Sequence, residues 1–198
     1  MVPLSVGFAR GPGNLIEVQV VYGGRRGPWL LDSAAGWHVL HRGMHPIEPG
    51  EALESLSVDI EGEGVEADTL EGEVLQLGRF RQQPDQVLAV DLPYRATTGQ
   101  PIQGLLGYPL FAEIALTIDW EQQTLILDGP PPFEVTHELP LRLEDRQALI
   151  PLQLAGEALE VRLETAYTGG LLIEAERFDI ERFASPEESG GPVRFETT

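Results

Sequence analysis

The sequence predicts an all-β fold with one short helix, followed by the start of a second, diverged copy of its first strands. Apolar and polar residues alternate over much of the chain, which is the pattern of half-buried strands, and glycine-bearing turns separate the alternating stretches. The alternating stretch that begins at Ile16 has a counterpart that begins at Ile150. We therefore expect two units, residues 1–138 and a partial repeat over residues 139–198.

The first unit divides into short strands between turns. The pattern predicts strands over residues 16–22, 29–31, 39–40, 56–60, 74–77, 86–90, 116–120 and 124–127. The segment from Pro109 to Ile114 has room for about one helical turn. The prolines at 130–132 cannot continue a sheet, because proline lacks the backbone donor, and they predict the end of the unit.

The second copy repeats a hairpin and the residues that follow it. Alternating apolar residues predict strands at 150–154 and 159–163, and the stretch 171–173 loosely matches residues 39–40. From Ile16 to Asp32 is 16 positions and from Ile150 to Glu164 is 14, so we expect the copies to differ by two residues in the hairpin turn. Residues 150–198 are too few for a complete equivalent of the first unit.

Composition narrows the possible partners. The 13 basic residues are all arginine, and 32 acidic residues give a formal net charge of −19. This charge argues against a nucleic-acid partner and an anionic membrane surface. There is no cysteine, which excludes disulfides and cysteine-ligated zinc. No apolar run reaches the ~20 residues of a membrane span. The sequence shows no signal-like segment, and it is compatible with both a cytoplasmic and an exported location.

Two motifs carry candidate chemistry. Asp32, Ser33 and Ala34 follow the apolar run at 29–31. Seventy-two residues after Asp32, a second motif ends a strand and enters the expected helix; it consists of Gly104, Leu105, Leu106 and Gly107. A hairpin at 116–127 then closes the unit. In this order, over roughly residues 14–128, these features resemble the retropepsin-like aspartic proteases.

The resemblance implies a closed barrel of the acid-protease type and a peptidase that needs no metal or cofactor. Two carboxylates hold a water between them and share one proton, because like charges at that distance cannot both ionise. Asp32 would be one of them and Glu164 a possible second. Each lobe supplies one carboxylate, so the lobes pair within one chain or in a homodimer. The hydroxyl of Ser33 would brace the two loops, and we expect this loop to pack against residues 104–107.

Two departures from the family pattern leave a second function open. Ala34 stands where the family has glycine, and Glu164 stands where it has aspartate. These departures favour a catalytically silent module that keeps the fold for peptide binding or assembly, whereas Asp32 and Ser33 favour a peptidase. The substrate or ligand would be a peptide or protein in either case.

The resemblance implies that the hairpin from Val58 to Thr69 covers the substrate. Its substrate-binding residues would be Asp59, Ile60, Glu61, Gly62, Glu63 and Gly64. The acidic tip suggests basic or neutral ligands. The alternative is an ordinary exposed hairpin.

His38, His41 and His45 lie close in sequence and could be considered metal ligands. Gly43 and Pro46 argue against a helix that would place two of them on one face, and no acidic ligand is fixed nearby. We therefore interpret them as loop or surface histidines and expect no metal site.

Overall fold

The computed structural model describes residues 4–166 except 49, 61–62 and 155–156, and all of the described residues belong to one compact unit. Within them the structure is mostly β, with the short helix α1 (Tyr108–Glu113) and the 3₁₀ turn η1 (Pro12–Asn14). The boundary expected at residue 138 stays a prediction.

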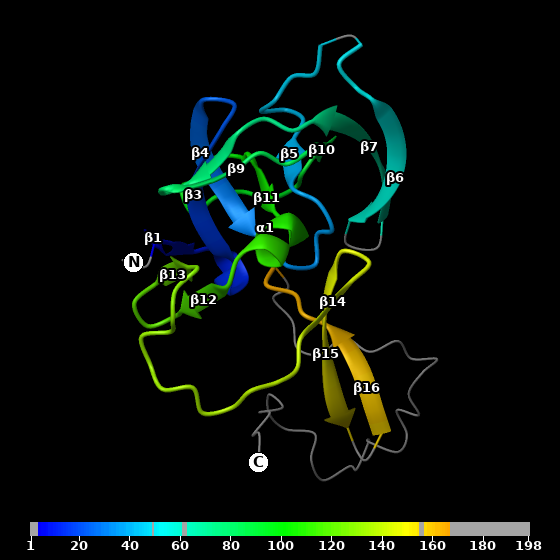
Figure 1. Ribbon diagram of the computed structural model, residues 1–198. Coiled ribbons are helices and arrows are strands. Elements are labelled where there is room, and N and C mark those ends of the chain that lie inside the picture. Colours follow the sequence, from blue (N-terminus) through cyan, green and yellow to red (C-terminus); the bar gives the residue numbers. More distant parts are fainter. Residues whose placement is uncertain (1–3, 49, 61–62, 155–156, 167–198) are drawn as a thin grey trace. The chain divides into compact units, whose positions relative to one another are not determined.

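Sixteen strands make up the rest of the described regular structure (Figure 1). They are β1 (Leu4–Gly7), β2 (Ala9–Arg10), β3 (Ile16–Tyr22), β4 (Arg25–Leu31), β5 (Val39–His41), β6 (Glu54–Ile60), β7 (Glu63–Glu71), β8 (Leu75–Leu77), β9 (Phe80–Gln82), β10 (Gln86–Val90), β11 (Gly104–Leu106), β12 (Leu116–Asp119), β13 (Thr124–Leu127), β14 (Arg142–Glu144), β15 (Gln147–Leu154) and β16 (Glu157–Arg162).

The strands form three open sheets. The largest has ten strands in the order β6-β7-β10-β5-β11-β4-β3-β8-β9, with β2 paired to β3. The two smaller sheets are β1-β13-β12 and β14-β15-β16. The expectation of a closed barrel is therefore wrong for the described residues: the end strands β6 and β9 of the large sheet do not pair with each other, and β1, β12 and β13 form a sheet of their own.

Parallel pairing inside the large sheet positions the candidate site. β4 runs parallel to β11, with Leu31 opposite Leu106. Parallel strands end at the same edge of a sheet, so the residues that follow them, Asp32 and Gly107, come together there. β5 completes the arrangement by pairing with β11 on its other side.

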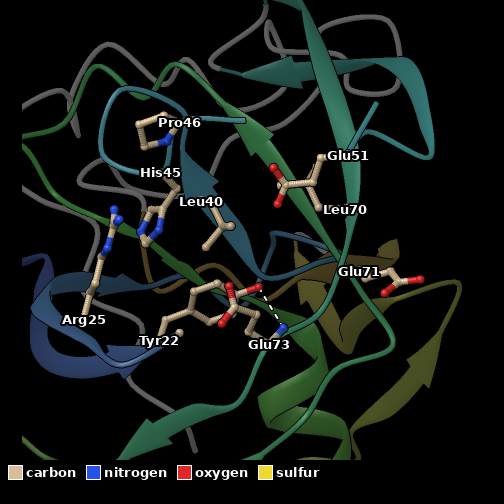
Figure 2. A pocket seen from close by; sticks show the side chains of 10 residues that line it. Tyr22, Arg25, Leu40, His45, Pro46, Glu51, Leu70, Glu71 and Glu73 are labelled. Carbon is tan, nitrogen blue, oxygen red and sulfur yellow. Dashed lines mark hydrogen bonds between the residues drawn. The ribbon is translucent and has the colours of Figure 1, made fainter. Parts of the chain in front are cut away.

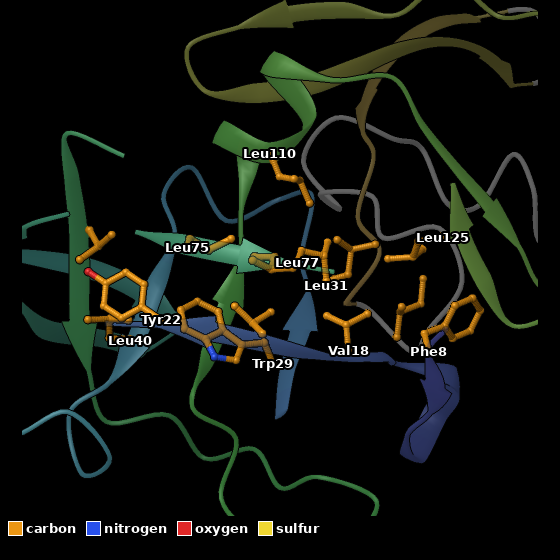
Figure 3. Close-up of a cluster of buried hydrophobic side chains, with 14 of the residues drawn as sticks. Phe8, Val18, Tyr22, Trp29, Leu31, Leu40, Leu75, Leu77, Leu110 and Leu125 are labelled. Carbon is orange, nitrogen blue, oxygen red and sulfur yellow. The ribbon is translucent and has the colours of Figure 1, made fainter. Parts of the chain in front are cut away.

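The main core lies against β3 and β4. The residues at alternate positions of β3, and Trp29 and Leu31 of β4, are at most 2% exposed. Leucines of β8, α1 and β13 pack against them (Figure 3). Burying a side chain of this size contributes roughly 1.5–3 kcal/mol, so this cluster anchors β4, the strand that leads into Asp32.

The second copy has the same hairpin geometry as the first. In the first hairpin Val18 pairs with Trp29 across a two-residue turn, and in the second Ile150 pairs with Val161. Both members are displaced by 132 positions, the same spacing that separates Ser33 from Thr165. Ile150 therefore corresponds to Val18, not to Ile16, and the expected difference of two residues in the turn is wrong. The stretch 171–173 lies outside the described residues.

Candidate functional site

Asp32 follows β4 directly and is fixed from both sides. Its backbone N–H donates to the carbonyl of Leu106 at 2.9 Å. Its carboxylate oxygen Oδ1 accepts from the N–H groups of Ala34 at 3.0 Å and Ala35 at 3.1 Å. The chain thus makes a tight turn around its own carboxylate, as aspartate commonly does at the end of a strand.

The surroundings favour the protonated form of Asp32. Burial is the largest influence and raises the pKa of this carboxyl above its usual range. The Ala34 and Ala35 donors oppose the shift, the negative charge of Glu164 adds to it, and the positive charge of Arg162 lowers it. A carboxyl that keeps its proton more readily than usual is suited to act as a general acid.

Ala34 fits its position without a backbone conformation that requires glycine. Its φ is not in the positive range, and its N–H reaches Asp32 at ordinary hydrogen-bond distance. Alanine is therefore compatible with the backbone at this position, because the chain takes a path open to any L-residue.

The predicted contact between the Asp32 loop and the second motif is confirmed. The N–H of Tyr108 donates to the carbonyl of Ala35 at 2.7 Å. A Cβ added to Gly107 would lie 1.8 Å from the carbonyl oxygen of Trp37 and 2.6 Å from that of Ala35. Gly104 is equally restricted, because its Cβ would lie 2.2 Å from the carbonyl oxygen of Val39. Glycine is needed here for close approach of two backbones.

Ser33 and Thr165 join the two copies through four reciprocal hydrogen bonds. The N–H of Ser33 donates to the Thr165 hydroxyl at 3.0 Å, and the N–H of Thr165 donates to the Ser33 hydroxyl at 3.1 Å. The Ser33 hydroxyl donates to the carbonyl of Leu163 at 2.7 Å, and the Thr165 hydroxyl donates to that of Leu31 at 2.9 Å. We call this set the hydroxyl ring. It gives Asp32 and Glu164 equivalent places, one before each hydroxyl residue.

Glu164 differs from Asp32 in its surroundings. Its carboxylate lies 3.6 Å from the guanidinium of Arg162, and its side chain is 33% exposed. The charge of Glu164 acts on Asp32, as the raised pKa of Asp32 reflects. The two carboxyl groups therefore differ: Asp32 is half-buried, whereas Glu164 is more exposed and ion-paired.

A second contact ties the copies together. The guanidinium of Arg146 stacks on the ring of Trp37, 3.5 Å from its centroid. Arg146 lies in the two-residue turn between β14 and β15, where Asp145 and Arg146 both have positive φ. A cation over an indole face is worth ~0.5–1 kcal/mol at an exposed site and more where it is desolvated. The turn of the second copy therefore rests on the loop of the first.

The hairpin β6–β7 is the segment expected to cover the substrate. Val58 and Ile60 pack against the apolar cluster that Ala35 and Trp37 also contact. The backbone of Gly64 pairs with Asp59. Glu61 and Gly62 lie outside the described residues, as do the side chains of Asp59 and Glu63, so the expected role of the tip stays a prediction.

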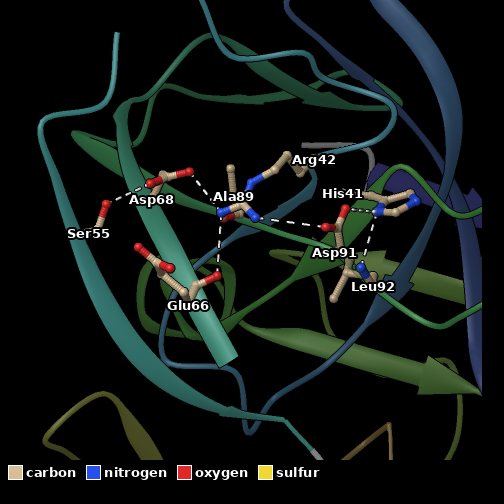
Figure 4. Close-up of polar contacts among 8 residues, drawn as sticks. All are labelled: His41, Arg42, Ser55, Glu66, Asp68, Ala89, Asp91 and Leu92. Atoms are coloured by element: carbon tan, nitrogen blue, oxygen red, sulfur yellow. Dashed lines mark hydrogen bonds and ion pairs between the residues drawn. The ribbon is translucent and has the colours of Figure 1, made fainter. Parts of the chain in front are cut away.

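Arg42 holds the base of this hairpin (Figure 4). Its guanidinium lies 2.8 Å from the carboxylate of Asp68 and 3.8 Å from that of Asp91. Asp68 in turn accepts from Ser55 across the two strands at 2.8 Å. These contacts lower the pKa of Asp68, with the Ser55 hydrogen bond as the largest cause. Strand β7 is thereby tied to the loop after β5.

The three histidines do not converge. His38 is fully buried and bonded to Gln82. The Nδ1 of His41 accepts from the N–H of Leu92 at 3.1 Å, and His45 packs edge-on against the ring of Tyr22. Among the described residues, no group of three or more histidine, cysteine or acidic side chains has an arrangement that could hold a metal ion. His38 lies in the loop between β4 and β5, which agrees with the expected loop position, but it is buried and not at the surface.

A cavity of about 150 Å³ lies at the opposite end of β4 from Asp32 (Figure 2). The residues that line it include Tyr22, Arg25, His45, Glu51 and Glu73. Arg25 begins β4 and Leu31 ends it, so the cavity is separated from Asp32 by the length of the strand. It plays no part in the candidate site.

Comparison with models of known protein families gives no match, and a search of curated proteins gives no significant relative. No helix among the described residues is long and apolar enough to cross a membrane. The identification of function therefore depends on the site itself.

Sequence reasoning overlooked the role of Thr165. The repeat aligns it with Ser33, and this was the available signal: a hydroxyl at the same place in each copy.

Proposed function

We propose that the protein is a retropepsin-like aspartic peptidase that assembles its site within one chain. The hydroxyl ring carries this proposal, because it places one carboxylate residue from each copy at equivalent positions on joined loops. Asp32 supplies a half-buried carboxyl with a raised pKa, and Glu164 supplies a partly solvated carboxylate whose charge acts on it. Unequal carboxyl groups of this kind divide the roles of acid and base.

The chemistry would be hydrolysis of a peptide bond by a water held between the two carboxyl groups. Ionised Glu164 takes a proton from the water while the water oxygen attacks the peptide carbonyl carbon. Protonated Asp32 gives its proton to the carbonyl oxygen, which stabilises the tetrahedral intermediate. The proton that Glu164 accepted then passes to the departing nitrogen, and Asp32 takes a proton back from a hydroxyl of the intermediate. The C–N bond breaks, an amine and a carboxylic acid are released, and both carboxyl groups return to their starting forms. No covalent enzyme intermediate forms.

Glu164 should make this peptidase slow. A glutamate side chain is one C–C bond longer than aspartate, about 1.5 Å, and a misplacement near 1 Å costs about 100-fold in rate. The ion pair with Arg162 also draws the Glu164 carboxylate toward the guanidinium and not toward a shared water. Substrates with basic or neutral side chains fit the net charge of −19.

The same observations favour the alternative of a catalytically silent module. A Glu164 carboxylate committed to Arg162 at 3.6 Å is less available to a shared water. The hydroxyl ring would then serve only to join the copies, and the hairpin β6–β7 would close over a bound peptide that is not cut.

Cleavage of a mixed peptide library from pH 3.5 to 8 separates the two. The peptidase proposal expects slow cleavage that is faster at mildly acidic pH than at pH 8, because one carboxyl must stay protonated. Asp32→Asn should abolish it, since the amide cannot exchange the proton. Glu164→Asp, the matched change in the second loop, should keep or increase activity, and Ala34→Gly should be equal or faster.

Two results decide against the peptidase. Cleavage that survives Asp32→Asn would come from another site or a contaminant. The silent module would be established if the parent protein, Ala34→Gly and Glu164→Asp all fail to cleave peptides across this pH range while the protein still binds them.

A further inference from the structure

His38 is buried between the Asp32 loop and the start of α1, with a hydrogen bond at each ring nitrogen. It is 0% exposed. Its Nδ1 accepts from the backbone N–H of Gly107 at 3.1 Å, and its Nε2 lies 2.8 Å from Oε1 of Gln82. Gln82 is oriented in turn, because its Nε2 donates to the carbonyl of Pro109 at 3.2 Å.

These partners select one form of the imidazole ring. A backbone N–H only donates, so Nδ1 must carry no proton, and the amide oxygen of Gln82 only accepts, so Nε2 must carry one. An imidazolium would place a second N–H against the N–H of Gly107. The site therefore fits neutral His38 in the Nε2–H form alone.

Three consecutive residues, from the last residue of β11 to the first of α1, bond to the Asp32 loop. The carbonyl of Leu106 accepts from Asp32, and the N–H of Tyr108 donates to Ala35. Between them the N–H of Gly107 donates to His38, which makes the imidazole the only side chain among these three links. The carbonyl of His38 also accepts from Leu88 of β10 at 3.0 Å.

We propose that His38 is a positioning residue for Asp32: its neutral ring joins the Asp32 loop to Gly107 and, through Gln82, to Pro109, and so holds the carboxyl in place. This inference rests on the proposed function for its effect on catalysis, but the positioning itself is a property of the fold. Protonation of the ring should loosen the loop.

Among the described residues, one charged group acts on the His38 ring. Gln82 of β9 and Leu88 of β10 are uncharged, and Glu113 of α1 is the charged group whose field reaches the ring. Burial is the dominant influence and lowers the pKa of His38 below 6.5, against the opposing effects of the Gln82 hydrogen bond and Glu113. Stability from neutral His38 is present above pH 6.5 and is lost as the pH falls through the lower value of the folded protein.

Nitrogen NMR of the histidine rings and amide hydrogen exchange test the positioning without any activity. We expect His38 in the parent protein to be neutral and in the Nε2–H form at pH 7. His38→Leu should increase exchange of the Gly107 and Tyr108 amides by about tenfold or more, which corresponds to one lost hydrogen bond. His38→Asn keeps an acceptor at the place of Nδ1 and should restore part of the protection. His137→Asn, at an exposed histidine, is the matched control.

Gln82→Glu tests the link between charge and position. A carboxylate in place of the amide favours the imidazolium, so protection of the Gly107 amide should be lost at a higher pH than in the parent. If cleavage is detected, His38→Asn should lower kcat with KM little changed. A ring that is charged or in the Nδ1–H form at pH 7, or Gly107 exchange that is the same in His38→Leu and His137→Asn, overturns the inference. Failure of peptide cleavage alone would count against the proposed function and leave these two measurements decisive for His38.

Discussion

Removing the two hydroxyl groups of the hydroxyl ring, singly and together, tests how strongly the copies are joined. Ser33→Ala deletes the donor to Leu163 and the acceptor for the Thr165 N–H. Thr165→Val deletes the donor to Leu31 and the acceptor for the Ser33 N–H. Each substitution therefore removes two of the four bonds, and no bond is counted twice.

The expected magnitudes follow from burial. Ser33 is 0% exposed, so backbone groups that lose its hydroxyl are poorly reached by water. At about 1–1.5 kcal/mol for each lost hydrogen bond, each single variant should destabilise the protein by about 2–3 kcal/mol. Independent bonds would give the double variant about 4–6 kcal/mol. Once one pair of bonds is lost, however, the loops separate and the other pair weakens, so we expect about 3–4 kcal/mol and a coupling of about 1–2 kcal/mol.

Urea unfolding of the parent, the two single variants and the double variant gives the coupling directly. Ser5→Ala, at an exposed serine of β1, is the control and should change the free energy of unfolding by less than about 0.5 kcal/mol. Effects of the two single variants that add to within about 0.5 kcal/mol would refute a cooperative ring, and a negligible effect of Ser33→Ala would refute the ring itself.

Three further predictions concern the surroundings of the site. Gly107→Ala should unfold the Asp32 loop or lower the melting temperature by many degrees, because its Cβ would lie 1.8 Å from the Trp37 carbonyl oxygen, whereas Gly7→Ala, with its nearest contact at 4.0 Å, should melt like the parent. Asp32→Asn should raise the melting temperature at pH 8 and lose this advantage near pH 4. Burial raises the pKa of Asp32, so the protonated carboxyl stabilises the folded protein fully below its ordinary pKa of 3.8, and this stabilisation is lost as the pH rises through the pKa of the folded protein. An advantage of Asp32→Asn that grows toward pH 4 would contradict the burial argument. Arg42→Lys keeps the charge but cannot bridge Asp68 and Asp91 together, so amide exchange at the base of β6–β7 should quicken, while Arg81→Lys, at an exposed arginine of β9, should leave it unchanged.

Long alternating stretches made most strands predictable. The alternation from Ile16 to Tyr22 predicts the buried face of β3 clearly. β10 and β13 were predictable instead as short apolar runs bounded by turns. The short strands β1, β2, β9 and β14 were not anticipated, because two to four residues carry too little periodicity and are held by their neighbours. Barrel closure was predicted wrongly, since pairing between the ends of a sheet leaves no local signal in the sequence.

The parts of the site that depend on neighbouring residues in the sequence were predictable. Asp32 at the end of a strand and the two glycines that flank Leu105–Leu106 could be recognised from residue type and order. The roles of Thr165 and His38 depend on partners far away in sequence, Thr165 on a residue 132 positions distant and His38 on Gly107, 69 positions distant. Such pairings arise from tertiary structure, and only the internal repeat hinted at the first of them.

Because Ser33 and Thr165 belong to one polypeptide, their loops meet at an effective concentration that the connecting chain sets. The backbone N–H and the hydroxyl of Ser33 both bond to the second copy of the same chain. Ser33 therefore has no need of a partner from a second molecule. Dilution should then leave the site assembled, whereas a site shared between two subunits would come apart. Because the two copies belong to one chain, their sequences can differ. One loop carries aspartate and serine and the other glutamate and threonine, whereas a symmetric pair of identical chains must have the same residues in both loops.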